Sequence, residues 1–212
     1  MSTPPLPPWI REARVDGYAT AHALLPDETR VYGTESLYGD WGGRVLLLAK
    51  DFAPSRILHA RRDRGDPRPY RHESRMGTNI RLARFADSLR TGPTAGDCGL
   101  LYGSALANLL REDGAVSGPL PSRDKAMAYG TKVLKFVLSK MPNLETIVSM
   151  GEDAWEATAS CLGRTEGWAE MRDRERGLRV DGLDLLVVFH PAARKSIPEH
   201  TRLWQRVVAA RT

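Results

Sequence analysis

Three polar residues stand at, or just after, the ends of apolar runs in the sequence: Asp51, Asn108 and His190. A carboxylate can orient a water molecule and stabilise positive charge. An amide can both donate and accept hydrogen bonds, and a neutral imidazole can donate one N–H. Each residue also has a structural alternative, because Asp51 could cap a helix or turn, Asn108 could close a turn, and His190 could bond to the backbone.

The apolar runs that carry these residues have the composition of strands that are buried on both faces. They are residues 45–49, 99–108, 145–150 and 183–189. Helical periods lie between them, and Trp204, Val207 and Val208 fit a closing helix. We therefore expect an α/β fold, a three-layer α/β/α sandwich around a four-stranded, mainly parallel sheet.

The chain shows one composition break, at its start. Residues 1–8 form a proline-rich tail, and residues 9–212 are expected to form a single domain. Within it, residues 9–25 have a loose helical pattern that Pro26 would end.

The carboxyl ends of parallel strands meet at one edge of a sheet, and ligands bind there in open α/β folds. Lys50 and Asp51, Asn108, the acidic helix start 151–153 and His190 should therefore converge on one rim. The sequence predicts a binding site at that rim.

A basic loop should leave the same rim. The chain has 31 Lys and Arg residues against 26 Asp and Glu residues. Arginine is frequent in residues 56–75, which include Arg61, Arg62, Arg71 and Arg75. Arginine suits phosphate because its planar fork donates two hydrogen bonds at once. A solvated loop without a ligand is the alternative.

Several classes of protein are excluded or disfavoured. No apolar run approaches the roughly 20 residues of a membrane span, and the start lacks a secretory signal, so we expect a cytoplasmic protein with no membrane contact. With 2 cysteines, the chain cannot build a four-thiolate zinc site or iron–sulfur cluster. No paired histidine spacing or phosphate-binding glycine loop is present, so we expect neither metal nor cofactor.

The order and spacing of four segments resemble the uracil-DNA glycosylase superfamily. The segments are LLLAKDFAPS with Asp51, ALANLLRED with Asn108, IVSMGEDAWEA, and VVFHPAARKS with His190. The resemblance extends from about Arg44 to the C-terminus.

The sequence departs from the superfamily at two motifs. The first motif keeps the aspartate but lacks the tyrosine that excludes thymine, and Ala192, Ala193, Arg194 and Lys195 follow His190-Pro191 in place of an apolar wedge. The cysteines of the iron–sulfur branches are also missing. The chain resembles a divergent, cluster-free branch.

The resemblance implies hydrolysis of the N-glycosidic bond of flipped-out uracil in DNA, leaving an abasic site and free uracil. Asp51 would position the water and His190 would stabilise the uracil anion. Uracil would be bound by Lys50, Phe52, Asn108 and His190. Asn108 would recognise the base through hydrogen bonds. Phe52 would stack on the base, with Tyr70 or Arg75 as alternatives.

The resemblance also implies contacts with DNA and an oligomeric state. Phosphate contacts would come from Arg61, Arg62, Arg71, Arg75, Arg194 and Lys195. The partner would be single- or double-stranded DNA containing uracil, bound by a monomer. The alternative function is a non-catalytic binder of damaged, abasic or single-stranded DNA, which needs neither Asp51 nor His190. A doubly wound nucleotide enzyme is a third possibility that no phosphate loop supports.

Overall fold

A five-stranded mixed sheet forms the centre of the computed structural model, which describes residues 2–27, 29, 31, 38–51, 54–65, 77–113 and 118–210. The strands lie in the order β3-β2-β5-β7-β6. Their bounds are β2 Val45–Ala49, β3 Leu100–Ser104, β5 Thr146–Met150, β6 Leu178–Val180 and β7 Leu183–Val188. Four strands are parallel, and β6 runs antiparallel to β7. The predicted α/β class is confirmed, but the sheet has five strands and not the four that were predicted.

The fifth strand arises from a tight hairpin. Asp181 and Gly182 join β6 to β7 with positive φ angles of 49° and 86°, and Val180 pairs with Leu183. Both central residues of this two-residue turn need left-handed backbone, which Asp-Gly adopts readily. The hairpin therefore adds an antiparallel edge to the parallel sheet.

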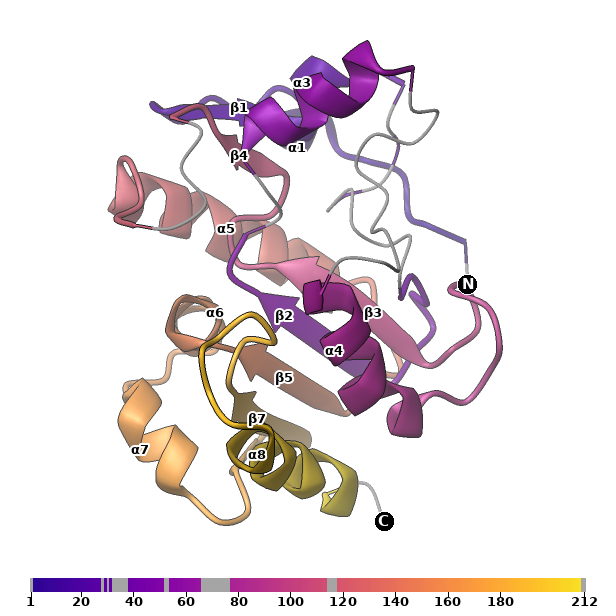
Figure 1. Cartoon of the computed structure of the whole chain (residues 1–212), viewed down its shortest axis with the longest axis vertical. Helices are drawn as coiled ribbons and strands as arrows, with labels where there is room; N and C mark the ends of the chain where they lie inside the picture. Colours follow the sequence, from indigo (N-terminus) through magenta and orange to yellow (C-terminus); the bar gives the residue numbers. More distant parts are fainter. Residues whose placement is uncertain are drawn as a thin grey trace.

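Helices cover both faces of the sheet (Figure 1). Leu47 and Val148 pack with α4 (Gly77–Ala86) and α8 (Ile197–Ala209). Leu46 and Ile147 point to the other face. That face is covered by α5 Arg123–Leu138, α6 Glu152–Cys161 and α7 Trp168–Asp173. These layers agree with the expected sandwich.

The N-terminal part differs from the single helix expected over residues 9–25. It forms α1 (Pro8–Arg11), β1 (Tyr18–Thr20) and α2 (Ala21–Leu24). Gly17 has a φ of +84°, which breaks the helical path, and β1 then pairs antiparallel with β4 (Leu109–Arg111). This small sheet lies beyond the end of β2 from which Lys50 leaves (Figure 1).

Two further expectations about local structure were wrong. The run 99–108 is not one strand, because β3 ends at Ser104 and a turn precedes β4; Ala107 in that turn has a φ of 52°. The basic segment is not all loop, since α3 (Ser55–Asp63) occupies its first part and carries Arg61 and Arg62.

The direction in which the chain moves across the sheet reverses beside β2. From β2 the chain passes to β3 on one side, and it later returns to β5 on the other side. The segments after β2 and β5 therefore diverge at their carboxyl ends, which is where open α/β sheets leave a crevice for a ligand. No described helix is long and apolar enough to cross a membrane.

Candidate functional site

The carboxyl ends of β2, β5 and β7 form the rim on which the candidate site is built. Leu48 pairs with Ser149, and Met150 pairs with Val188, so the three strands end side by side. A Cβ added to Gly151, which has a φ of +100°, would lie 3.7 Å from the Cβ of His190. The segments that carry Asp51, Gly151 and His190 therefore leave neighbouring strand ends.

His190 is a neutral imidazole with a defined tautomer. Its Nδ1 accepts a hydrogen bond from the backbone N–H of Ala192 at 3.2 Å, so the proton resides on Nε2. The pKa of His190 is lowered to about 4, chiefly by burial and to a smaller extent by the nearby His200 and Lys50. At neutral pH the ring offers one N–H donor and no charge.

Asp51 is a half-buried carboxyl at the end of β2. Burial raises its pKa, whereas the charges of Lys50 and Arg111 lower it and Asp153 raises it slightly. Desolvation is the largest of these effects. The carboxyl thus lies in a poorly hydrated place, within electrostatic reach of two cations.

Lys50, a predicted uracil-binding residue, forms an ion pair with a residue of α6. Its Nζ lies 3.3 Å from Oδ2 of Asp153, and Oδ1 of Asp153 accepts from Arg123 at 3.0 Å. This pair spans the divergence between β2 and β5. Asp153, in the first turn of α6, belongs to the helix start 151–153 that was expected at the rim, although no uracil- or DNA-binding role was predicted for it.

Asn108 lies in the turn after β3, whose Leu106 N–H donates to the carbonyl of Lys50, but its side chain is engaged elsewhere in the protein. Its side chain is 1% exposed, and Nδ2 donates to the carbonyl of Ile10 at 2.9 Å and contacts Nδ1 of His22 at 2.8 Å. Oδ1 accepts from the hydroxyl of Tyr129. The amide is therefore engaged within the protein. The cause is the early end of β3, which places Asn108 in the following turn rather than at a strand end.

Two residues at the rim have no counterpart among the predicted site residues. Tyr18 of β1 pairs in register with Arg111 of β4, and the Arg111 side chain is 2% exposed. Within the described residues, the Tyr18 hydroxyl is buried with no hydrogen-bond partner. Its pKa is raised to about 12, chiefly by burial, with Arg111 opposing and Asp51 and Asp153 adding to the rise. The hydroxyl therefore lies within electrostatic reach of Asp51.

The predicted DNA-binding residues are only partly described. Arg194 and Lys195 are exposed in the segment after His190, and Lys195 Nζ lies 3.8 Å from Glu199. Arg61 and Arg62 lie on α3, but their side chains are outside the description. Phe52, Tyr70, Arg71 and Arg75 lie outside the described residues.

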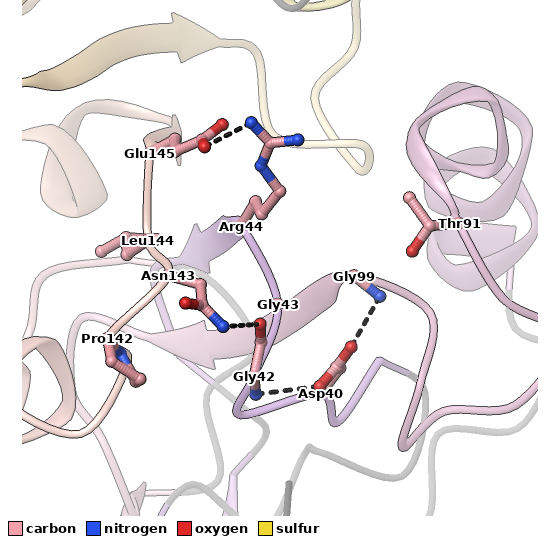
Figure 2. A pocket seen from close by; sticks show the side chains of 10 residues that line it. All are labelled: Asp40, Gly42, Gly43, Arg44, Thr91, Gly99, Pro142, Asn143, Leu144 and Glu145. Carbon is pink, nitrogen blue, oxygen red and sulfur yellow. Dashed lines mark hydrogen bonds and ion pairs between the residues drawn. The ribbon is translucent and has the colours of Figure 1, made fainter.

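A hollow lies at the opposite, amino-terminal end of the strands, with a volume of about 570 Å³. Figure 2 shows that the side chains of Asp40, Asn143, Arg44 and Glu145 bond within its walls. Asp40 accepts from the N–H groups of Gly42 and Gly99 at 2.9 and 2.8 Å. Asn143 donates to the Gly42 carbonyl at 3.1 Å. These hydrogen bonds connect the segment before β2 with the segments before β3 and β5. We therefore assign them a structural role.

Metal ligation has no support in the part of the chain that the structure describes. No group of three His, Cys, Asp or Glu side chains stands close enough there to hold a metal ion. Cys98 and Cys161 are free thiols, and burial raises the pKa of both. Such thiols are protonated and poor ligands.

Comparison with known proteins adds no assignment. No protein-family model matches the sequence, and no curated protein matches it. The case for a function therefore rests on the geometry and charge of the rim.

Proposed function

We propose that this protein is a DNA glycosylase that hydrolyses the N-glycosidic bond of uracil in DNA. The observation that supports it most is the pairing of a poorly hydrated carboxyl, Asp51, with a neutral imidazole, His190, whose free N–H is on Nε2. They follow β2 and β7, which flank β5. Roughly 10 Å separates two such strands, so in this proposal the two side chains approach the nucleoside from opposite sides.

In this proposal Asp51 acts on the sugar. Cleavage passes through an oxocarbenium-like sugar, which a nearby carboxylate stabilises. Asp51 also orients the water molecule that attacks C1′ and accepts its proton. The positive charges of Lys50 and Arg111 oppose the rise in the pKa of Asp51 that burial causes, and so favour the ionised form that this role requires.

His190 acts on the leaving group. The electron pair of the C1′–N1 bond departs with uracil, and the negative charge spreads to O2. The Nε2–H of His190 donates to this oxygen, and a preformed donor stabilises most where charge develops. Because the pKa of His190 is about 4, uracil departs as an anion and not by proton transfer from an imidazolium.

The remaining predictions belong to the same proposal. The partner is uracil-containing DNA, single- or double-stranded, bound by a monomer in the cytoplasm and contacted by Arg194 and Lys195. Free uracil is the second product. We do not assign base reading to Asn108, because its amide is already bonded to Ile10, His22 and Tyr129.

The test is a base-excision assay with chelator present. Purified protein is incubated with a uracil-containing oligonucleotide and with a matched thymine oligonucleotide, as single and double strands, and alkali then breaks abasic sites. We expect a break at the uracil position only. No break in any substrate would overturn the proposal.

One observation favours a second candidate, a non-catalytic binder of damaged, abasic or single-stranded DNA. The engaged amide of Asn108 removes the expected base reader, and a binder needs none. Tight binding to abasic DNA without any excision of uracil would favour this candidate.

A further inference from the structure

A groove of about 700 Å³ runs along the outer edge of the sheet, between β6, β7 and α8, and is distinct from the rim. Its charged lining combines four arginines with two acids. They are Arg176, Arg179, Arg202, Arg206, Glu175 and Asp184. Nothing in the proposed catalytic chemistry uses this groove.

The charges of the groove are incompletely balanced. Arg179 is neutralised by Asp184, with Nη1 and Oδ1 3.1 Å apart. No carboxylate lies within salt-bridge distance of Arg176 or Arg202 in the described part of the chain. Both side chains belong to exposed residues, so two guanidinium groups are available to a ligand.

Arg206 is fixed in the wall of the groove. Its Nε donates to the Glu175 carbonyl at 3.0 Å, and its Nη1 donates to the Arg172 carbonyl at 2.8 Å. Among the described residues its Nη2 is buried without a partner. Burial and repulsion from the adjacent Arg202 lower the pKa of Arg206, whereas Asp173 and Glu175 raise it. An anion in the groove would relieve this repulsion between like charges.

Helix α8 connects the groove with the rim. It begins at Ile197, a few residues after His190, and buries Leu203 and Trp204. Arg202 and Arg206 are one turn apart on it. The 13 residues of α8 span about 20 Å at 1.5 Å per residue, about the length of six nucleotides of one strand in duplex DNA.

We propose that this groove binds the phosphate backbone of DNA that extends beyond the rim along α8, with Arg176 and Arg202 as the phosphate contacts. The inference rests on the proposed function for the identity of the polymer. Arginine from two facing elements suits a chain of phosphates, because each fork can engage one phosphate.

The test compares DNA length and salt. Binding of the full chain to labelled single-stranded DNA, about 3 or about 20 nucleotides long with a non-hydrolysable uracil nucleotide at one end to place it at the rim, is measured by fluorescence anisotropy over a salt series. The double variant Arg176→Gln/Arg202→Gln should bind the long DNA on the order of tenfold more weakly. Its slope of log affinity against log salt should shrink by about 1.4, as for two lost contacts. Its affinity for the short DNA should stay within twofold of wild type.

A matched control removes the same charge elsewhere. Arg44→Gln/Lys140→Gln changes two exposed cations outside the groove and should leave long-DNA affinity near that of wild type. Equal losses in both double variants, or wild-type binding of long DNA by Arg176→Gln/Arg202→Gln, would overturn the proposal.

Excision separates this proposal from the catalytic one. A short uracil oligonucleotide should be excised at the wild-type rate by Arg176→Gln/Arg202→Gln at saturating enzyme. Length-dependent binding without any excision by the wild type would retain the groove and remove the glycosylase. Excision without length-dependent binding would retain the glycosylase and overturn the proposed DNA-binding role of the groove.

Discussion

Charged and polar side chains gather at both ends of the central sheet, and they are used differently. At the amino end, Asp40 accepts from two backbone N–H groups and Asn143 donates to a carbonyl (Figure 2). At the carboxyl end, Asp51 and His190 have pKa values displaced by burial, and the Tyr18 hydroxyl has no partner.

The difference shows why a hollow alone does not mark a site. The amino-end hollow measures about 570 Å³, yet its described hydrogen bonds join its own walls. The carboxyl end keeps groups in electrostatically unfavourable states, which costs folding free energy and is characteristic of functional sites. Variants matched between the two ends can test this contrast.

The largest expected effect is on chemistry at the carboxyl end. His190→Ala should lower the single-turnover rate of uracil excision by roughly 10²-fold or more, because it removes the donor to the departing oxygen. DNA affinity should stay within a few-fold. Asn143→Ala at the amino end should leave the rate unchanged. Equal rates for His190→Ala and wild type would remove His190 from the site.

Stability should respond with opposite signs at the two ends. Asp40→Ala leaves the N–H groups of Gly42 and Gly99 without their acceptor, so the free energy of unfolding should fall by about 2–4 kcal/mol. Asp51→Asn replaces a carboxyl whose pKa is raised by burial, so at pH 7 the free energy of unfolding should rise. Urea denaturation measures both. A destabilised Asp51→Asn would show that the carboxylate holds the fold together.

Two tyrosine hydroxyls offer the next comparison. Tyr18→Phe removes a buried hydroxyl without a partner, so stability should stay equal or rise, while the excision rate falls about tenfold if the hydroxyl binds substrate. Tyr38→Phe at the amino end removes a donor to Asp87 at 3.0 Å. It should cost about 1 kcal/mol of stability and leave the rate unchanged. The opposite pattern would place the working hydroxyl at the amino end.

The smallest expected effect is a shift in the pH dependence of excision when one of two ion pairs, Lys50–Asp153 but not Arg44–Glu145, is broken. Excision should increase with pH through the raised pKa of Asp51 and then level off, since His190 is neutral above about 4. Lys50 lowers the pKa of Asp51, so Lys50→Gln should move this limb to higher pH. Arg44→Gln, which breaks an exposed pair with Glu145, should leave the limb in place and change stability by less than about 1 kcal/mol.

The pH profile needs a stability control, because His190 also links folding to pH. Its pKa is about 4 in the folded protein and 6.5 unfolded. The unfolded chain therefore binds a proton between these values while the folded protein does not, so stability falls as pH falls from 6.5 to 4. Circular dichroism at each pH identifies loss of rate that comes from unfolding.

The layers and the parallel strands were predictable because their signal is local. The largely apolar strands β2 and β5 are buried along their whole length, and β7 is buried over its last four residues, as expected. The hairpin at Asp181-Gly182 also had a local signal, a turn pair between apolar residues, that the sequence reading did not use.

The residues that were mispredicted depend on long-range pairing. An apolar run conceals the turn after Ser104, which is closed by a bond from its hydroxyl to the Ala107 carbonyl at 2.8 Å. Tyr18 and Arg111 meet through strands about ninety positions apart, which no local period reports. Asn108 was misplaced, and Tyr18 missed, for this reason.

The most direct measurement is single-turnover release of uracil from one labelled oligonucleotide by wild type, Asp51→Asn and Asp40→Ala, at a temperature where circular dichroism finds all three folded. We predict release by wild type and Asp40→Ala at similar rates, and at least 10²-fold slower release by Asp51→Asn. Release by Asp51→Asn at the wild-type rate, or no release by wild type, would contradict the assignment of catalysis to the carboxyl ends of the strands.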